Sequence, residues 1–439
     1  MTELPYCDGG ADRVISLAEL TSAISQQAAD IVDSGARKVL LVPPDHTRLY
    51  SGAGFITGVL YEELRAAGLH VAALPALGTH APMTPDDARL LFGDRVPHEA
   101  LSVHRWRDGL VELGRIDASE VARVSRGRLA IEIPVAVDGM LVNEPWDRVV
   151  SIGQVVPHEV IGMANFTKNL VIGLGGAPTV HRSHFLGAVC DMETIMGEAA
   201  SPVRTIVDAA FDRFIAPLVK VTWILTVMED TSGGVVQRGL YVGQGRTNES
   251  GGAAYRDAAE LAAAVNITRV SRRFDRAVCW LDPNEFRSTW LGNKAIYRTR
   301  MAMADHGHLM VLAPGVGHFG EDPAIDSLIR RHGYHGTPAT LAAVDQDPEL
   351  AASLGTAAHL IHGSTEGRFR VTYCTDPNAG GLTRHEVEDV GYHWQHLGDA
   401  ITELGISGAG SASRGTQRDR HGTAFEYIPN PALGLWKAT

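Results

Sequence analysis

Three side chains between residues 158 and 184 carry groups that can move protons, bind a metal or form a covalent bond. His158, Lys168 and His184 are separated by 10 and 16 residues, and several glycines lie among them. Imidazole transfers protons near neutral pH and is a common metal ligand, and a lysine amine is a nucleophile once it has lost its proton. Each side chain alone is more often an ordinary polar residue. Their joint occurrence in a glycine-rich segment indicates a functional site.

Further polar side chains follow two short apolar segments nearer the N-terminus. Asp45 and Arg48 come after the apolar run 38–42, and His80 comes after the run 71–77. Such runs are typical of strands buried in a parallel sheet, and ligands bind beyond the carboxyl ends of strands in open α/β sheets. We therefore expect these side chains at one edge of a sheet. A simpler alternative is that Asp45 and Arg48 only pair and cap the following helix.

The order of helix-like and strand-like segments predicts an α/β fold with two domains and mostly parallel sheets. We expect an N-terminal α/β domain over residues 1–270, a C-terminal α/β domain over 275–415 and a C-terminal tail over 416–439, with the active site in the cleft between the domains. The expected strands are 38–42, 71–77, 129–137, 148–152, 219–227, 235–242, 277–281, 308–313 and 369–374. The expected helices are 17–36, 52–67, 253–265, 290–304 and 322–331.

Composition excludes several classes of protein. The 439 residues carry a formal net charge of −12, which disfavours a nucleic-acid-binding surface. No apolar stretch is long enough to cross a membrane, and the N-terminal residues lack the apolar core of a signal peptide. The four cysteines are far apart and form no Cys-x-x-Cys, so neither a disulfide framework nor a cysteine-built zinc site is expected. We expect a cytoplasmic protein that acts on a small molecule.

The combined pattern resembles the nickel-dependent lactate racemase family. The family signature combines Asp-x-Thr-Arg, Gly-Thr-His, and a histidine followed at fixed spacing by a lysine and a second histidine. Its counterparts here are Asp45-His46-Thr47-Arg48, Gly78-Thr79-His80, His158, Lys168 and His184. The resemblance covers roughly residues 15–415 and implies an isomerase, a racemase or epimerase of hydroxy acids.

The resemblance also implies a cofactor and a role for each residue. Lys168 would be joined covalently to a nickel-pincer nucleotide (pyridinium-3-thioamide-5-thiocarboxylic acid mononucleotide), and His184 would be the protein ligand of the nickel. His80 and His158 would be the paired acid and base. Enzymes that make the cofactor would be transient partners. The other implied contacts are Asp45, Thr47 and Gly162 to the cofactor, and Arg48, Trp290, Leu291 and Lys294 to the substrate.

Elementary chemistry is consistent with these roles. The Cα–H of a 2-hydroxy carboxylate is very weakly acidic, and a histidine with a pKa near 6.5 is a poor base for it. The same histidine suits the hydroxyl proton if the carbon-bound hydrogen leaves as hydride, which the cofactor would accept. A guanidinium such as Arg48 suits bidentate binding of the substrate carboxylate.

One position departs from the family pattern. The family usually has a glutamine three residues before the lysine that matches Lys294, and this chain has Leu291 there, beside Trp290. An apolar side chain in place of an amide changes what the pocket can hold. We therefore expect a bulkier or differently polar 2-hydroxy acid, or a sugar acid, rather than lactate.

Three alternatives remain open at the level of sequence. A zinc-dependent hydrolase could use His158, His181 and His184, although the zincin His-Glu-x-x-His is interrupted by Gly162. A nicotinamide dehydrogenase is disfavoured, because neither glycine cluster has the Gly-x-Gly-x-x-Gly spacing. A non-catalytic protein that binds the cofactor or a small acid would need Lys168 and His184 but no acid–base pair.

Overall fold

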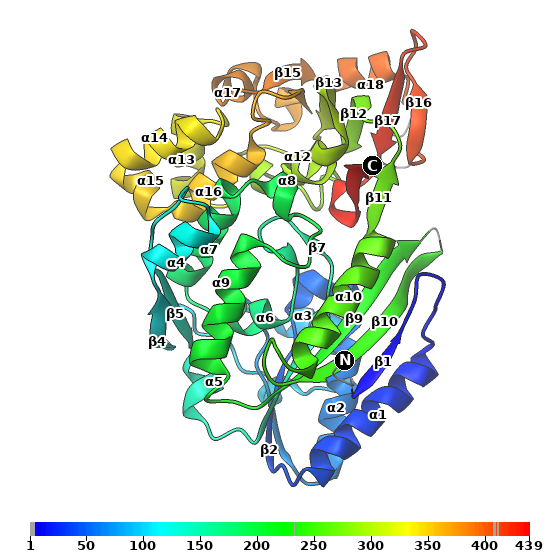
Figure 1. The fold of residues 1–439 in the computed structure, drawn as a ribbon. Coiled ribbons are helices and arrows are strands. Elements are labelled where there is room, and N and C mark those ends of the chain that lie inside the picture. The colour runs from blue at the N-terminus through cyan, green and yellow to red at the C-terminus, as the bar shows by residue number, and fades with distance from the viewer. Residues whose placement is uncertain (1–4, 232, 407–409, 411) are drawn as a thin grey trace. The chain divides into compact units, whose positions relative to one another are not determined.

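The computed structural model describes residues 5–231, 233–406, 410 and 412–439. By internal contacts the chain divides into two compact units (Figure 1). The first contains the described residues up to Cys190 together with Thr194–Asn266, and the second contains Asp191–Glu193 and Ile267–Thr439. Both units combine helices with a mainly parallel sheet, which confirms the predicted α/β fold. Among the described residues, no helix is long and apolar enough to span a bilayer.

The first unit is built on a six-stranded sheet of order β1-β10-β9-β6-β2-β3. Strands β9, β6, β2 and β3 are parallel, whereas β10 pairs antiparallel with both β9 and β1. Parallel β2 and β6 are apolar on both faces because each face of the sheet is covered. The strand bounds are β1 Tyr6–Gly9, β2 Lys38–Val42, β3 His70–Ala73, β6 Arg148–Gln154, β9 Val221–Thr231 and β10 Gly234–Gln244.

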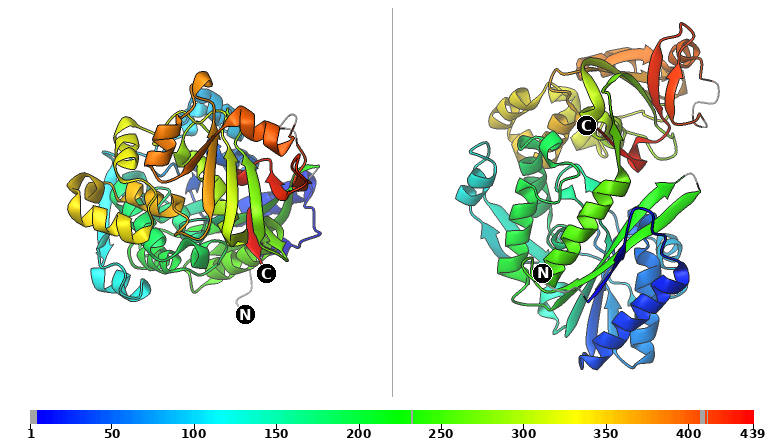
Figure 2. Two further views of the ribbon diagram at one scale, coloured as in Figure 1. Left: turned by 90° about the horizontal axis from the view of Figure 1, so that it is seen from above. Right: turned by 45° about the vertical axis from the view of Figure 1, so that its right-hand side comes forward.

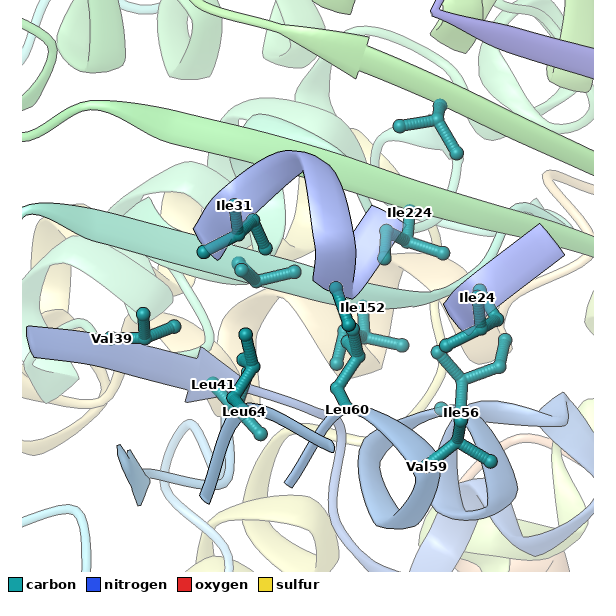
Figure 3. Close-up of a cluster of buried hydrophobic side chains, with 14 of the residues drawn as sticks. Ile24, Ile31, Val39, Leu41, Ile56, Val59, Leu60, Leu64, Ile152 and Ile224 are labelled. Carbon is teal, nitrogen blue, oxygen red and sulfur yellow. The ribbon is translucent and has the colours of Figure 1, made fainter. Parts of the chain in front are cut away.

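Helices cover both faces of this sheet. Helices α1 (Leu17–Asp33) and α2 (Ala53–Ala66) pack on one face, where Ile24, Leu60 and Ile224 belong to one buried cluster (Figure 3). Successive strand residues point to opposite faces, so Trp223 lies on the other face, where it contacts Phe166. In the right-hand view of Figure 2, α10 (Ser250–Asn266) and the blue N-terminal helices lie on opposite sides of β9 and β10.

The remaining elements of the first unit surround the segment that carries the candidate site. The hairpins are β4 Leu110–Ile116 with β5 Ile133–Asp138, and β7 Pro157–His158 with β8 Gly162–Met163. The helices are α3 Pro85–Phe92, α4 Ala118–Val124, α5 Gly139–Asn143, α6 Thr167–Val171, α7 Ala177–Val189 and α9 Pro202–Ala210, with α8 Met192–Ile195 at the junction of the units. Shorter turns are η1 His46–Ser51 and η2 His98–Ala100, and η3 Phe211–Ile215 is a π-helix.

The second unit has its own six-stranded sheet, of order β15-β14-β13-β12-β17-β16, in which only β16 is antiparallel. Its strands are β12 Phe274–Trp280, β13 Met303–Leu312, β14 Arg370–Thr375, β15 His393–His396, β16 Gly415–Arg418 and β17 Ala424–Ile428, and β11 Ile267–Val270 pairs with β18 Leu435–Ala438. Its helices are α11 Thr289–Gly292, α12 Lys294–Thr299, η4 Arg300–Ala302, α13 Pro323–His332, α14 Thr337–Gln346, α15 Pro348–Ala352, α16 Leu354–Gly363, η5 Pro377–Ala379, α17 Arg384–Asp389, α18 Leu397–Leu404 and η7 Pro431–Leu433.

Residues 416–439, which the sequence analysis set apart as a tail, belong to the second unit. Strand β17 inserts beside β12, and β18 pairs with β11. Phe425 and Tyr427 belong to the buried core of the second unit. Burial of these two apolar side chains stabilises the packing of strand β17 against the rest of the unit. The boundary between the units falls at Asn266/Ile267, close to the predicted end of the first domain at residue 270.

Candidate active site

Asp45 and His80 form a pair at the carboxyl ends of β2 and β3. The chain leaves β2 at Val42, and Asp45 caps the turn η1 by accepting hydrogen bonds from the Thr47 amide (3.1 Å) and hydroxyl (2.5 Å). Its other carboxylate oxygen lies 2.7 Å from Nδ1 of His80. Thr47 thus acts here as a cap partner of Asp45, the local structural role that the sequence analysis left open for this turn.

The pair fixes the proton on the His80 ring. Asp45 is buried, which alone would raise its pKa, but hydrogen bonds from His80 and Thr47 outweigh burial and hold the pKa of Asp45 below its ordinary value. An ionised carboxylate only accepts hydrogen bonds, so His80 Nδ1 carries a hydrogen. The Nε2 atom of His80, whose side chain is 60% exposed, makes no hydrogen bond with a described residue and is available to take up a proton.

His158 has the opposite arrangement. It ends strand β7, its side chain is buried, and its Nδ1 accepts a hydrogen bond from the Val160 amide at 3.1 Å. Burial, and then the positive charge of Lys168, hold the pKa of His158 well below its ordinary value. The neutral ring therefore carries its hydrogen on Nε2, where it acts as a hydrogen-bond donor.

Lys168 lies on the short helix α6, which follows two non-glycine residues with left-handed backbone, Asn165 (φ 65°) and Phe166 (φ 59°). This conformation is costly for residues with a side chain and is retained where function or surrounding contacts demand it. Arg204 supplies those contacts: it donates to the carbonyls of Met163 (2.7 Å) and Asn165 (3.2 Å).

Arg204 belongs to a buried cluster that holds the loop before Lys168. It also donates to the Thr167 hydroxyl at 2.8 Å, and that hydroxyl donates to Asp208 at 2.5 Å. The guanidinium lies 4.5 Å from the ring centre of Tyr255, which stacks on Phe166. Sequence analysis missed this cluster because its members are distributed over α6, α9 and α10 and no motif joins them. The only signal was an arginine among the apolar residues of α9.

The surroundings of Lys168 favour a reactive amine. Burial, followed by the charge of Arg48 and, more weakly, that of Arg204, lowers the pKa of Lys168 to about 8, while Glu159 and Asp45 oppose the shift. The neutral amine is the nucleophilic form, and its share at pH 7 to 8 is far larger than for an ordinary lysine. The same charges show that Arg48, Asp45 and Glu159 lie near Lys168.

His184 presents a free ring nitrogen. It lies on α7, and its Nδ1 donates to the Val180 carbonyl at 2.7 Å, one turn earlier in the helix. Burial, and then the charge of Lys168, lower the pKa of His184 to about 4. The ring is therefore neutral at pH 7, with its lone pair on Nε2. Metal-ligating histidines usually have this arrangement, with one nitrogen held by a carbonyl and the other turned to the metal.

The mutual influence of these groups shows which predicted residues the first unit brings together. The charge of Arg48 acts on His158 and Lys168, and His184 acts on His158. Asp45 links His80 to this group through its hydrogen bond and its effect on Lys168. Residues far apart in sequence thus lie close enough to influence one another, while their roles in a site stay predictions.

Gly162 has a structural explanation. It has φ 94°, and a Cβ atom there would lie 2.2 Å from the carbonyl oxygen of Glu198, so no side chain fits against the backbone of residues 195–198. The β7–β8 hairpin that carries His158 therefore needs glycine at this position, whether or not Gly162 also contacts a cofactor.

The three predicted substrate contacts in the second unit lie on α11 and at the start of α12. Trp290 stacks on the buried ring of His359, with centroids 4.4 Å apart, and the Lys294 amine lies 5.7 Å from the ring centre of Phe286. Leu291 is half-buried beside them. That these residues meet the cluster of the first unit, in a cleft between the domains, stays a prediction.

A three-ligand metal site is not formed within the described part of the chain. No group of three or more His, Cys, Asp or Glu side chains there is placed to hold a metal ion. The described residues therefore give no support to the alternative zinc site of His158, His181 and His184. His184 lies close enough to His158 and Lys168 for their charges to interact, and its role as a nickel ligand stays a prediction.

Comparison with known proteins agrees with this geometry. The family described as "Lactate racemase N-terminal domain" matches residues 13–197, the range that holds every predicted site residue of the first unit. No curated protein matches the chain. A crystal structure of a protein from Thermotoga maritima superimposes with a TM-score of 0.79 at 22% identity, covering 98% of this chain and 100% of that one. The lactate racemase apoprotein from Thermoanaerobacterium thermosaccharolyticum superimposes with a TM-score of 0.65 at 15% identity, covering 99% of both chains.

At these identities the solved structures establish the fold alone, while the family match establishes the relationship of the N-terminal segment. Residues 13–197 are therefore a lactate racemase N-terminal domain, which confirms the resemblance predicted from the motifs, and the whole chain has the lactate racemase fold.

Proposed function

We propose that this protein is a racemase or epimerase that inverts the carbinol carbon of a 2-hydroxy acid, with a nickel-pincer nucleotide joined to Lys168. The observation that carries the proposal is the surroundings of Lys168. An amine with its pKa lowered to about 8 lies among two neutral imidazoles, His158 and His184, and the arginine Arg48. A lysine with only a structural role would not require burial beside an arginine and two imidazoles, which lowers the pKa of its amine.

The residues present fit the cofactor. The Lys168 amine is the nucleophile for a thioamide link, and His184 Nε2 is the free lone pair for nickel. When bound, such a cofactor accepts hydride from the carbinol carbon of the substrate and returns it. The protein then has to bind the acid, move the hydroxyl proton and keep the reacting carbon in place.

His80 is the proton acceptor of the resting site. Its Nδ1 hydrogen points to ionised Asp45, so its Nε2 is free to take the hydroxyl proton as the carbinol is oxidised. Asp45 stabilises the imidazolium that results, as a buried carboxylate does for any histidine base that it orients. The predicted contact of Asp45 with the cofactor stays a prediction beside this role.

His158 is the hydrogen-bond donor of the resting site. Its Nδ1 is occupied by the Val160 amide, so Nε2–H is the group that it presents. This hydrogen stabilises the substrate oxygen in both directions. The proton that His80 accepts from the hydroxyl returns to the oxygen when the carbinol forms again. Two imidazoles of opposite tautomer give inversion a donor and an acceptor at the start of the reaction.

Arg48 is the proposed holder of the substrate carboxylate. It is exposed, it lies close enough to His158 and Lys168 to affect both, and a guanidinium binds a carboxylate through two parallel hydrogen bonds. Trp290, Leu291 and Lys294 are proposed to complete the substrate site. Leucine in place of an amide favours an acid larger than lactate, such as a longer 2-hydroxy acid or a sugar acid. The proposal implies a cytoplasmic enzyme that meets the cofactor-making enzymes transiently.

Co-expression with the cofactor-making enzymes, followed by intact-mass and metal analysis, tests the proposal. We expect a nucleotide-sized adduct on Lys168 and about one nickel per chain. Lys168→Met should lose both adduct and nickel, whereas His184→Ala should keep the adduct and lose nickel, because only the metal ligand is removed. Lys220→Met, a change of the same type at an exposed lysine of the first unit, is the matched control and should keep both. Zinc without an adduct in the wild type would contradict the proposal.

A further inference from the structure

A second pocket, of about 270 Å³, lies at the other end of the sheet of the first unit. Arg148 is the first residue of β6, Lys220 immediately precedes β9, and Arg246 follows β10; all three line the pocket. Its apolar wall includes Phe211, which begins the π-helix η3. Strand β6 runs seven residues from this pocket toward His158, a length of roughly 20 Å. The pocket is thus remote from the candidate active site.

The cations of this pocket lack partners. Neither the Arg148 guanidinium nor the Lys220 ammonium makes a hydrogen bond or ion pair with any residue that the structure describes, and Arg246 donates only to the Asp212 carbonyl, at 2.9 Å. The one carboxylate of the lining, Glu249, accepts a hydrogen bond from the Arg246 amide at 2.7 Å. The lining thus holds three cations and one carboxylate, and Asp147, outside the lining, is close enough to Lys220 for their charges to interact. This local excess of positive charge occurs in a chain whose net charge is −12.

Arg148 has the least favourable position of the three. It is half-buried, and burial lowers its pKa because the charged form loses hydration. Its Nε atom is buried without a hydrogen-bond partner. A buried charge or donor without a partner destabilises the folded state, so such groups are usually paired. An anion that enters the pocket would supply this partner.

We infer that this pocket binds a small multivalent oxyanion, such as a phosphate or pyrophosphate group, between Arg148, Lys220 and Arg246. Guanidinium groups bind phosphate oxygens through paired hydrogen bonds, and an ammonium adds a mobile point charge. The volume is below the range usual for drug-sized ligands and suits a compact anion rather than a whole nucleotide. This inference does not depend on the proposed racemase activity.

The test uses the full-length protein without cofactor and inorganic pyrophosphate as the probe. Thermal unfolding and titration calorimetry are recorded with pyrophosphate and with sodium chloride at equal ionic strength. We expect pyrophosphate, but not chloride, to raise the unfolding midpoint, because a ligand that binds only the folded state stabilises it. In Arg148→Met the pyrophosphate affinity should fall at least tenfold, while the ligand-free unfolding midpoint should stay the same or rise.

Arg256→Met is the matched control, since Arg256 is exposed on α10, has no side-chain partner among the described residues and does not line the pocket. It should bind pyrophosphate like the wild type. If Arg148→Met fails to fold, Lys220→Met, at an exposed residue, should weaken binding by itself. An equal response to pyrophosphate and chloride, or wild-type affinity in both pocket variants, would overturn the inference.

Discussion

The first unit contains two histidine–aspartate pairs with similar contacts and different surroundings. His80 Nδ1 lies 2.7 Å from Asp45, and His104 Nδ1 lies 2.9 Å from Asp138. The His104 side chain is 0% exposed and its Nε2 is also bound, to the Gly175 carbonyl at 3.1 Å, whereas the His80 side chain is 60% exposed. Both ring nitrogens of His104 are thus engaged in hydrogen-bond contacts, and the ring has no atom left for chemistry.

A hydrogen bond to an aspartate is common to both histidines, so it does not by itself indicate a reactive ring. What differs is the other ring nitrogen, which is hydrogen-bonded in His104 and open in His80. His104 and Asp138 link the strand β5 to the glycine-rich turn at Gly175, just after the helix that carries Lys168. Asp45 and His80 instead leave one nitrogen open at the carboxyl edge of the sheet. The same chemical pair thus supports the loop structure in one place, and under the proposed function it moves a proton in the other.

The largest expected effect is on turnover in His80→Gln. Loss of a general base typically lowers kcat by about 10²- to 10⁴-fold. The free energy of unfolding should fall by about 1 kcal/mol, less than in His104→Gln, because the His80 side chain is exposed and only its hydrogen bond to buried Asp45 is lost. Turnover of the cofactor-loaded enzyme and urea unfolding check both parts. If His80→Gln lost stability and kept full turnover, His80 would have a structural role like that of His104.

His104→Gln should show the reverse pattern. Removal of the imidazole leaves the buried Asp138 carboxylate with only its backbone hydrogen bonds, which costs roughly 1 to 3 kcal/mol of unfolding free energy. Urea unfolding of the cofactor-free protein measures this loss. Turnover per folded, loaded molecule should remain within a few-fold of the wild type, because His104 presents no free nitrogen. A large loss of turnover in a fully folded variant would contradict the comparison.

Asp45→Asn should have an intermediate effect on turnover. An amide still hydrogen-bonds to the His80 ring but neither fixes its tautomer nor stabilises the imidazolium. Loss of a partner that orients a functional histidine typically lowers activity by about 10- to 100-fold. The loss should fall on kcat, with KM little changed, in steady-state assays. The matched change Asp138→Asn should alter stability instead.

The smallest effect is on the pH dependence of stability. Burial alone would raise the pKa of Asp138, but hydrogen bonds from His104 and from backbone amides hold it below its ordinary value. A lowered folded-state pKa gives stability that is present above the unfolded pKa, about 3.9, and is lost as pH falls through the folded value. Unfolding free energy should therefore decrease below about pH 4, and less steeply in Asp138→Asn. Asp86→Asn, at an exposed carboxylate, should follow the wild type.

Sequence predicted the sheet of the first unit best where apolar runs were continuous. The predicted strand 38–42 has the same bounds as β2. A strand that is buried on both faces is apolar along its whole length, so its ends are visible in the sequence as the ends of the apolar run. The predicted helix 290–304 is instead divided: α11 ends at Gly292, α12 starts at Lys294, and β13 begins at Met303. Local propensity does not reveal such breaks, which tertiary contacts impose.

The candidate site was predictable where motif spacing specified it. The motif named His80, His158, Lys168 and His184, and the fold of the first unit explains how each presents its reactive atom. The partners that orient them were not predictable. The His80–Asp45 and His104–Asp138 pairs have sequence separations of 35 and 34 residues, so spacing alone gives no means to tell the reactive pair from the structural one. Arg204 was missed for the same reason, as its contacts are set by packing.

Turnover in deuterium oxide tests the central claim most directly. The cofactor-loaded enzyme is allowed to racemise or epimerise its 2-hydroxy acid in deuterated solvent, and the isotope at the carbinol carbon is read by NMR. If the imidazoles move only the hydroxyl proton, the product keeps its original hydrogen on that carbon. Deuterium at the carbinol carbon, appearing at the rate of inversion, would mean that a histidine removes the carbon-bound proton, and would contradict the account.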